Sequence, residues 1–499
     1  MSQWLDFALN PPKIRCMENN DVPRPRGSTR RAFLSASAVT AVAAPIVSHA
    51  TIANAAPAAG AAKSGSAGSA QVFDPALRAL IGQIDPAKIK ATIQKLVGFG
   101  TRNTLSSQTD PVRGIGAATA WVTQQMQSFA AASGGRMTVQ QQNFTQQSGL
   151  PAPTPITNVI ATLQGTASPE RFYVVTGHLD SRASNVLDFT SDAPGADDDG
   201  SGVAVVLELT RVFATHQFPG TLVFATVAGE EQGLFGSAHL AAQMNAAGTD
   251  VQGMFSNDIV GASRAFDGTK PDPFTLRLFV EGVPTAATAN DIALLRSTGG
   301  ENDSKSRQLG RFVTDAAPFN LTMMNVRTIW RRDRFLRASD HVSFESLGYP
   351  AARFTEPREN FNHEHQDVRV VNGVQFGDLI DFVDFDYIAR VTAVNAASVW
   401  ALATAPGTPK NLQIHTTPPA GLPGTNLTTL TWNANPEPNL AKYEVVTRET
   451  TAADWTNTID AGNVTTITLD ISKDNVQFGL RAVDTAGNRS PVAFPAVAP

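Results

Sequence analysis

Between residues 73 and 404 the chain alternates short apolar runs with longer amphipathic stretches, and this pattern restricts the fold more than any other feature. Short runs bounded by turn residues predict strands, and the clearest lie at 158–163, 172–176 and 222–227. Stretches with apolar residues at helical spacing predict helices at 203–214 and 233–244. Strands that alternate with helices form a mostly parallel sheet covered by helices, so the predicted fold class is α/β.

Acidic and histidine side chains follow the apolar runs at four places. In α/β sheets, ligands bind beyond the carboxyl ends of the strands, so a functional site is expected where these side chains meet. The four places hold His178 and Asp180, Asp197 to Asp199, Glu230 and Glu231, and Asp258 together with His363, His365 and Asp367. Each of them has an ordinary interpretation on its own, as a helix cap or a solvated turn.

The three consecutive aspartates at 197–199 carry the most information. A carboxylate at a helix N-terminus contributes about 0.3–1 kcal/mol, but capping needs only one of the three. Adjacent carboxylates repel one another unless a cation neutralises them, so the motif favours a metal site. Asp180 can lie beside His178, because residues two apart on a strand point the same way. A carboxylate beside a metal-binding imidazole fixes its tautomer.

The composition limits the chemistry of such a site. The single cysteine, Cys16, lies in the first 55 residues, so the rest of the chain offers no thiolate and forms no disulfide. A metal site must therefore use histidine and carboxylate ligands, and thiol catalysis is excluded. The net charge of −5 argues against a nucleic-acid partner, because phosphate binding needs a basic surface.

Residues 1–55 are typical of an export signal. The pair Arg30-Arg31 precedes an Ala-rich apolar stretch, and the small residues at 53–55 form a cleavage site. The paired arginines resemble the twin-arginine form, so we expect an exported protein, periplasmic or extracellular, in which residues 56–72 are flexible. No other segment approaches about twenty apolar residues, so no transmembrane segment is expected in the mature chain.

The composition changes after residue 404, where a linker with Pro and Gly begins. Short strand-like runs separated by turns follow, and Trp432 lies on an early one. This pattern predicts a small β-sandwich over residues 405–499. The spacing of Trp432 and Tyr443, and the late run 477–484, resemble a fibronectin type III module. We expect this module to act as a spacer or to contact a polymer or a cell surface.

The order His-x-Asp, Asp-Asp-Gly-Ser-Gly, Glu-Glu, Asp and His-x-x-x-Asp resembles the co-catalytic zinc aminopeptidases, of the bacterial leucyl aminopeptidase and glutamate carboxypeptidase type. The resemblance covers about residues 90–400, and its most specific parts are the segments 177–181 and 195–202. It implies a zinc-exopeptidase fold for residues 73–404, two Zn²⁺ ions as cofactors and peptides as substrates.

The same resemblance implies a role for each site residue. The implied metal ligands are His178, Asp198, Glu231, Asp258 and His363, with Asp198 bridging the two ions. Glu230 would be the general base, and Asp180 would orient His178. A cis peptide bond is implied between Asp198 and Asp199.

The last ligand is the one position where two residues compete. His363 and His365 both lie near the expected place, and the His-x-x-x-Asp spacing to Asp367 favours His363. Asp340 and His341, in a Ser-Asp-His segment upstream, are expected to support the site without binding metal.

The implied function is an exported zinc-dependent aminopeptidase, because a carboxylate-rich site suits the free ammonium of a peptide. Two other reactions on the same fold stay open. A carboxypeptidase needs an arginine near the metals, and five arginines lie between residues 327 and 337. A glutaminyl-cyclase-like acyl transferase would work with one metal. A domain that only binds would have lost ligands, and none is missing.

Overall fold

The computed structural model describes residues 65–66, 71–72, 74–264, 270–417 and 426–498. The predicted export signal at 1–55 and most of the predicted flexible segment at 56–72 lie outside the described residues. In the part described, no helix combines the length and the apolar character needed to cross a membrane. The described residues belong to one compact unit, and the predicted division at residue 404 stays a prediction.

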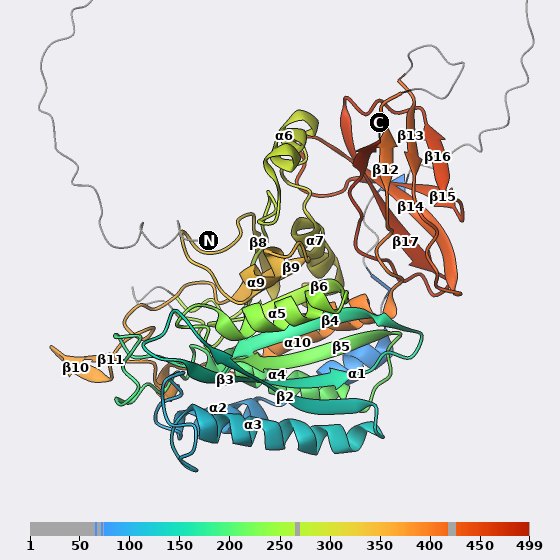
Figure 1. Ribbon diagram of the computed structural model, residues 1–499. Coiled ribbons are helices and arrows are strands. Elements are labelled where there is room, and N and C mark those ends of the chain that lie inside the picture. The colour runs from blue at the N-terminus through green and yellow to red at the C-terminus, as the bar shows by residue number, and fades with distance from the viewer. Residues whose placement is uncertain (1–64, 67–70, 73, 265–269, 418–425, 499) are drawn as a thin grey trace, which may run out of the picture. The chain divides into compact units, whose positions relative to one another are not determined.

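An eight-stranded sheet forms the centre of the fold, in the order β2-β3-β5-β4-β6-β9-β7-β8 (Figure 1). Its strands are β2 (Met137–Gln146), β3 (Thr154–Leu163), β4 (Ser168–His178), β5 (Gly220–Val227), β6 (Asp250–Asn257), β7 (Thr275–Phe279), β8 (Asn325–Ile329) and β9 (Ala351–Thr355). The central strands β5, β4, β6 and β9 are mutually parallel. The pairings β2–β3, β3–β5 and β7–β9 are antiparallel, whereas β7–β8 is parallel. The predicted α/β class is confirmed, with a sheet that is mixed toward its edges.

Helices cover both faces of this sheet (Figure 1). One face carries α1 (Pro75–Ile81), α2 (Pro86–Val97), α3 (Ile115–Ala130), α4 (Gly200–Phe213), α7 (Lys305–Ala316) and α10 (Phe385–Thr404). The other face carries α5 (Phe235–Ala246) and α9 (His341–Glu345). The shorter elements are α6 (Ala289–Thr298), α8 (Phe319–Thr322), and the 3₁₀ turns η1 (Ala131–Ser133) and η2 (Ile380–Phe382).

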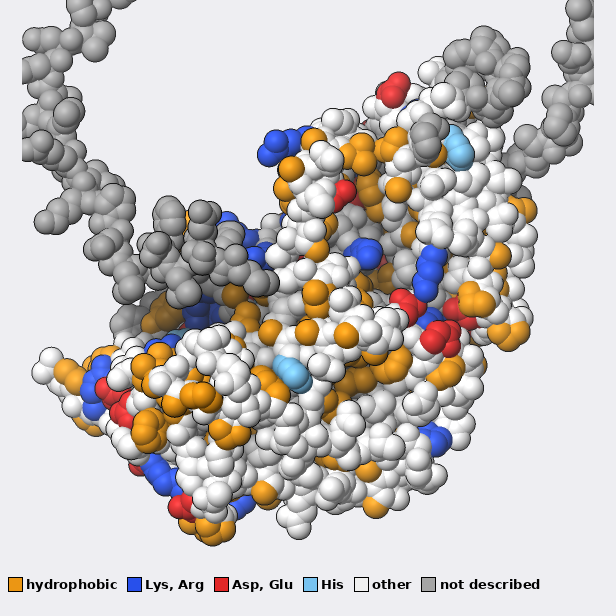
Figure 2. Space-filling view, viewed as in Figure 1, with side chains coloured by type: hydrophobic (Ala, Val, Ile, Leu, Met, Phe, Trp, Pro, Cys, Tyr) orange, Lys and Arg blue, Asp and Glu red, His pale blue; other side chains and the backbone are white. Residues whose placement is uncertain are grey.

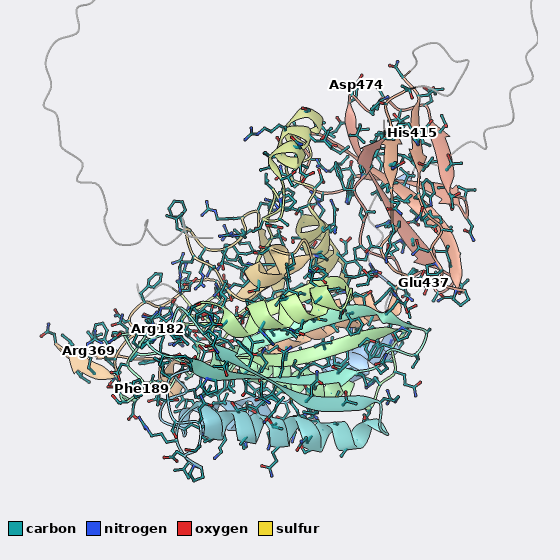
Figure 3. All side chains as sticks on the ribbon, in the orientation of Figure 1. Arg182, Phe189, Arg369, His415, Glu437 and Asp474 are labelled. Atoms are coloured by element: carbon teal, nitrogen blue, oxygen red, sulfur yellow. The ribbon has the colours of Figure 1, made fainter. Side chains whose placement is uncertain are left out.

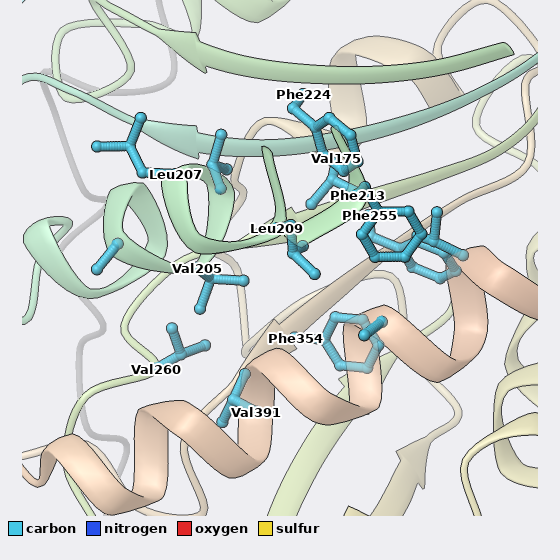
Figure 4. Packing of buried hydrophobic residues seen from close by; sticks show 14 of the residues in the cluster. Val175, Val205, Leu207, Leu209, Phe213, Phe224, Phe255, Val260, Phe354 and Val391 are labelled. Atoms are coloured by element: carbon cyan, nitrogen blue, oxygen red, sulfur yellow. The ribbon is translucent and has the colours of Figure 1, made fainter. Parts of the chain in front are cut away.

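Alternation of side chains along the strands separates two hydrophobic cores. Val175 and Phe224 belong to the larger core, which α4 and α10 close on their side (Figure 4). Their chain neighbours Val174 and Val223 belong to the smaller core, under α5. Successive side chains of a strand point to opposite faces, so a continuous apolar strand such as β5 is buried on both sides, and all of its residues are buried.

Two glycines let α4 lie close against β4. A Cβ atom on Gly177 would lie 2.5 Å from the carbonyl carbon of Gly202, and one on Gly202 would lie 2.2 Å from the carbonyl oxygen of Asn257. A larger residue at either position would have to displace the neighbouring backbone. The glycines of the two most specific motifs therefore bring the N-terminus of α4 to the ends of β4 and β6.

The C-terminal part forms two four-stranded sheets that share one core, and one of these strands, β1, comes from residues 65–66. One sheet has the order β1-β15-β14-β17 and the other β16-β13-β12-β18. Their bounds are β1 (Gly65–Ser66), β12 (Gln413–His415), β13 (Thr428–Thr431), β14 (Leu440–Glu449), β15 (Asn457–Gly462), β16 (Thr466–Leu469), β17 (Val476–Asp484) and β18 (Ala496–Ala498). Trp432 packs edge-on against Tyr443 in this core, with ring centroids 5.3 Å apart. The predicted sandwich is present, and its fibronectin type III identity stays a prediction.

A buried ion pair joins β14 of the C-terminal sheets to the residue segment just before α7. The side chains of Arg448 on β14 and Asp303, just before α7, are 2% and 0% exposed, and their charged atoms lie 2.5 Å apart. Arg311 of α7 reaches the same carboxylate at 3.1 Å. The face shown in Figure 2 carries charges of both signs among apolar side chains.

Candidate metal centre

Two groups of side chains meet beyond the carboxyl ends of the parallel strands. One group is His178, Glu230 and Asp258, and the other is Asp198, Glu231 and His365. In each group, one nitrogen or oxygen atom from every residue lies within 4.8 Å of the others. β4 ends at His178, β5 ends three residues before Glu230, and β6 ends just before Asp258. The edge of the sheet where the sequence predicts a site is therefore the edge where these side chains converge.

Asp198 lies between two histidines. Its Oδ1 is 3.1 Å from Nε2 of His178, and its Oδ2 is 2.9 Å from Nε2 of His365. Burial alone would raise the pKa of Asp198, but hydrogen bonds from His178 and His365 outweigh it and hold this pKa well below its usual range. A buried carboxylate with one oxygen toward each of two ligand sets has the geometry of a bridging ligand.

The three neighbouring aspartates have three different partners. Asp199 caps α4 through the N–H of Gly202 at 2.9 Å and also accepts the N–H of His178 at 2.8 Å. Asp197 accepts the N–H of Gly261 at 2.7 Å. Only Asp198 of the three faces the histidines, and the implied cis peptide bond between Asp198 and Asp199 is present.

Asp180 holds the loop that carries the two glutamates. Its carboxylate accepts the N–H of Glu230 at 3.2 Å and of Glu231 at 3.1 Å, and the hydroxyl of Thr104 at 3.3 Å. Toward His178 the shorter contact is made by the backbone carbonyl of Asp180, 3.1 Å from Nδ1, while the carboxylate is 3.7 Å away. The predicted orientation of His178 thus comes mainly from the Asp180 backbone, and its side chain positions the glutamates.

The two glutamates face different partners. Oε2 of Glu231 lies 3.3 Å from Nε2 of His365, whereas Glu230 belongs to the group of His178. Burial raises the pKa of the Glu230 carboxyl well above its ordinary value; His178 opposes this shift and the charge of Asp258 adds to it. Among the described residues, the buried Oε1 of Glu231 has no hydrogen-bond partner. Buried polar atoms are normally satisfied, so an orphaned carboxylate oxygen beside an imidazole fits a divalent cation such as zinc.

The last ligand position requires a correction, because the structure brings His365 to the site and not His363. The ring of His363 stacks on Phe382 with centroids 3.5 Å apart, and its Nδ1 lies 3.0 Å from Nδ2 of Asn360. His365 has a left-handed backbone, with φ of 53°, which directs its side chain toward Asp198. The Asp367 used for the spacing instead accepts the N–H of Ser184 at 3.0 Å.

Three supporting residues were not predicted from the sequence. The carboxylate of Asp378 accepts the N–H of Asp197 at 2.9 Å and of Asp198 at 2.7 Å. Arg353 and Ser339 both contact the carboxylate of Asp258. Asp378 belongs to no recognisable motif, and Arg353 lies inside the apolar run of β9, so no sequence pattern distinguishes them. The neighbours of Ser339, Asp340 and His341, are buried at the start of α9, and their supporting roles stay a prediction.

Two arginines near the site are already paired with carboxylates. Arg334 lies 3.2 Å from Oε2 of Glu359 and 3.7 Å from Oε1 of Glu364, and Arg337 bridges the same two glutamates. Burial raises the pKa of Glu364 to about 7, and the charge of Glu359 adds to this shift. These arginines therefore pair with the carboxyl groups of two glutamates, one of which precedes His365 in the chain.

A loop and a hairpin lie beside the site. Residues 182–192 and the hairpin of β10 (Arg369–Val371) and β11 (Val374–Phe376) are joined by reciprocal hydrogen bonds between Ser184 and Asp367, at 3.0 and 2.9 Å. Figure 3 shows Arg182, Phe189 and Arg369 at this end of the molecule. Nη1 of Arg182 is 3.9 Å from Oε2 of Glu231.

Comparison with known proteins places this site in a family. Residues 158–370 match the model of peptidase family M28. A probable zinc metalloprotease of Leptosphaeria maculans is 48% identical over 421 residues, which cover 84% of this chain and 96% of the relative. A probable zinc metalloprotease of Pyricularia oryzae is 48% identical over 435 residues, which cover 86% of each chain.

Solved structures with a similar fold include two kinds of enzyme. The LapA aminopeptidase of Legionella pneumophila has a TM-score of 0.47 and 18% identity, with 67% of this chain and 77% of that chain covered. The glutaminyl cyclase of Fimbriiglobus ruber has a TM-score of 0.46 and 18% identity, with 66% and 97% covered. The site geometry and the close relatives together identify the chain as a zinc metalloprotease that belongs to peptidase family M28.

Proposed function

We propose that the protein is an aminopeptidase that holds two zinc ions and removes residues from the free amino terminus of peptides. The observation that carries this proposal is the position of Asp198, whose two oxygens face His178 and His365 separately. His178 and Asp258 would hold one ion, Glu231 and His365 the other, and Asp198 both. Imidazole and carboxylate ligands suit zinc, and two-metal hydrolases use such sets.

The chain's own residues supply the acid–base chemistry. Zinc ions, when bound, would polarise the scissile carbonyl and make the attacking water more acidic. Glu230 lies in the group of His178 and Asp258, next to the proposed ligand Glu231. It would accept the proton of the attacking water and donate it to the nitrogen of the leaving amine. Asp180 keeps Glu230 in place by accepting its backbone N–H.

The charge of the site favours an amino-terminal substrate. Glu231 and Asp258 would be neutralised by the zinc ions that they hold, whereas Glu230 is not a proposed ligand and would attract an ammonium group. A carboxypeptidase would need a guanidinium for the terminal carboxylate. Arg334 and Arg337 are paired with Glu359 and Glu364, and Arg182 lies 3.9 Å from the proposed ligand Glu231.

Chromogenic aminoacyl anilides, tested with free and with acetylated amino groups, decide between these activities. We expect cleavage of the free substrates and loss of most of it after acetylation, because acetylation removes the ammonium charge. Zinc content of the same preparation should be two ions per chain. If acetylated anilides are cleaved equally well, the aminopeptidase assignment fails, and the zinc metalloprotease assignment is unaffected.

Two further parts of the proposal concern the ends of the chain. We propose that residues 1–55 direct export through a twin-arginine route, on the basis of Arg30-Arg31. Replacement of both arginines by lysine should then leave the protein inside a bacterial expression host.

We also propose that residues 405–499 contact a polymer or a cell surface, which a pull-down with the isolated surface material would test.

A further inference from the structure

Two segments beside the site carry exposed apolar side chains. They are the loop 182–192 and the segment 367–376, which contains the β10–β11 hairpin, and the bonds between Ser184 and Asp367 join them. Clustered apolar surface that is exposed on a protein usually marks an interaction site. The exposed large apolar residues of the two segments, which we call the apolar rim, are Leu187, Phe189, Val368, Val370, Val371 and Val374.

The hairpin leaves its valines outside the packed interior. Successive residues of a strand point to opposite faces, and all three residues of β10 are exposed. Val370 and Val371 therefore show apolar surface to solvent on both faces of the strand. Antiparallel strands with a solvated face normally place polar residues on it. Neither valine belongs to a hydrophobic core of the described residues, so packing does not explain them.

Phe189 is presented by a preformed turn. Oδ1 of Asp188 accepts the N–H groups of Thr190 and Ser191, each at 3.0 Å, and Phe189 lies inside this turn with 48% of its surface exposed. Phe189 and Arg369, one from each segment, lie at the same end of the molecule (Figure 3). A side chain that is held in place before binding loses less conformational entropy when it makes a contact.

Both segments are tied to residues next to the proposed ligands. The side-chain amide of Gln232, which directly follows Glu231, donates to the carbonyl oxygen of Val186 at 3.3 Å. After the hairpin, the carboxylate of Asp378 accepts the N–H of Asp198 at 2.7 Å. The apolar rim thus begins a few residues along the chain from the site and continues outward from it.

A peptide that is cut near its end must leave the site past the surface that surrounds it. An extended chain advances about 3.3–3.6 Å per residue. The third and fourth residues of such a peptide therefore lie roughly 7–11 Å beyond the first. These residues are outside the site and can reach side chains on the surrounding segments.

We propose that the apolar rim binds the third and fourth residues of a peptide substrate, so that the protein favours peptides in which these residues are apolar. Phe189 and Val370 are the specificity-determining residues of this contact. The inference rests on the proposed aminopeptidase function and concerns a part of the substrate distant from the scissile bond. Such a contact contributes binding without changing the reacting groups, so it should lower KM by about tenfold and leave kcat similar.

Two tetrapeptides isolate this contact. Both begin with leucine and glycine, and one ends in two phenylalanines while the other ends in two serines. The scissile bond is the same in both, so a difference in KM for the release of leucine reports the third and fourth residues. With the full chain, we expect KM to be about tenfold lower for the phenylalanine peptide.

Variants of the apolar rim assign the difference to its residues. Phe189→Ser and Val370→Ser should each raise KM for the phenylalanine peptide by about threefold and narrow the gap between the two peptides. Phe189→Leu keeps an apolar side chain and should preserve most of the gap. Val464→Ser, at an exposed valine between β15 and β16, is the matched control and should leave both KM values unchanged. Phe189 and Val370 lie on different segments, so each tests the apolar rim if the other variant fails to fold.

Equal KM values for the two peptides in the wild type would overturn the inference, as would a gap that survives both serine variants. If a second copy of the chain covers the apolar rim instead, light scattering should show a dimer that Val370→Ser dissociates, with equal KM values for the two peptides. A wild-type chain that releases leucine from neither peptide would contradict the proposed aminopeptidase function. The two failures are therefore distinguishable.

Discussion

Nε2 of His365 lies 2.9 Å from Oδ2 of Asp198, on the side of the carboxylate opposite to His178. Replacement of His365 by alanine should therefore remove one zinc ion and lower the rate of hydrolysis by at least about 100-fold, since an ion that polarises the substrate is lost. Zinc content and turnover of an aminoacyl anilide measure both effects.

His363 provides the matched control for His365. Its ring stacks on Phe382 and does not approach Asp198, so His363→Ala should keep both ions and most of the activity. A larger loss of zinc in His363→Ala than in His365→Ala would contradict the geometry of the site.

Replacement of Glu230 should slow catalysis without changing metal binding. Glu230→Gln preserves shape but removes the group that accepts the proton, which costs about 10²–10⁴-fold in rate. Zinc content should stay unchanged, because the proposed ligands are intact. Loss of zinc in Glu230→Gln would show that this residue is a ligand.

Asp378 should affect the affinity for zinc without being a zinc ligand, because it holds the backbone of Asp197 and Asp198. Asp378→Ala leaves the N–H groups of Asp197 and Asp198 without their acceptor. Loss of a partner that orients a ligand typically costs about 10–100-fold in metal affinity, and zinc competition against a chelator measures it. The exposed Asp381, three residues away, is the control, and Asp381→Ala should leave the affinity unchanged.

The buried pair of Arg448 and Asp303 should stabilise the fold without affecting the chemistry. Arg448→Ala leaves a buried carboxylate with Arg311 and the amide of Gln308 as its remaining partners, so we expect the free energy of unfolding to fall by about 3 kcal/mol. Denaturant titration measures this change. Lys410 forms an exposed pair with Asp250, and Lys410→Ala should cost less than about 1 kcal/mol.

Glu444 on β14 should make stability depend on pH. Burial alone would raise its pKa, but hydrogen bonds from Arg489 and the charge of Arg481 outweigh burial and lower the pKa from 4.5. A carboxyl whose pKa is lower in the folded state stabilises the fold above its unfolded pKa. The stability that separates wild type from Glu444→Gln should therefore be constant at neutral pH and disappear as pH falls below 4.5. A difference that persists at pH 2 would exclude this ionic origin.

The parts of the fold that follow from repeating patterns could be predicted from the sequence. The strand ending at Val227 and the helix over 200–213 depend on apolar periodicity, which burial imposes on both. His178 and Asp258 could be placed together because they end neighbouring parallel strands. β15 and β18 were not predicted: β15 has no alternation of apolar and polar residues, and β18 is only three residues long.

The spacing of residues in the sequence could not distinguish His363 from His365, because the deciding property is the backbone conformation of His365. The left-handed backbone at His365 turns its side chain toward Asp198, and a non-glycine residue seldom adopts this conformation. Asp378 and Arg353 act on the site through hydrogen bonds across the fold. Such contacts leave no periodic pattern in the sequence.

The β10–β11 hairpin is held at both of its ends by carboxylates. Asp367 binds Ser184 on one side, and Asp378 binds the backbone of Asp197 and Asp198 on the other. The tip between these two anchors projects into solvent, and Val370 is 65% exposed. An insertion at the Asn372 turn would therefore lengthen the hairpin and reshape the approach to the site while both anchors stayed in place. The length of the β10–β11 hairpin can thus change while the position of Asp198, the proposed bridging ligand, stays fixed.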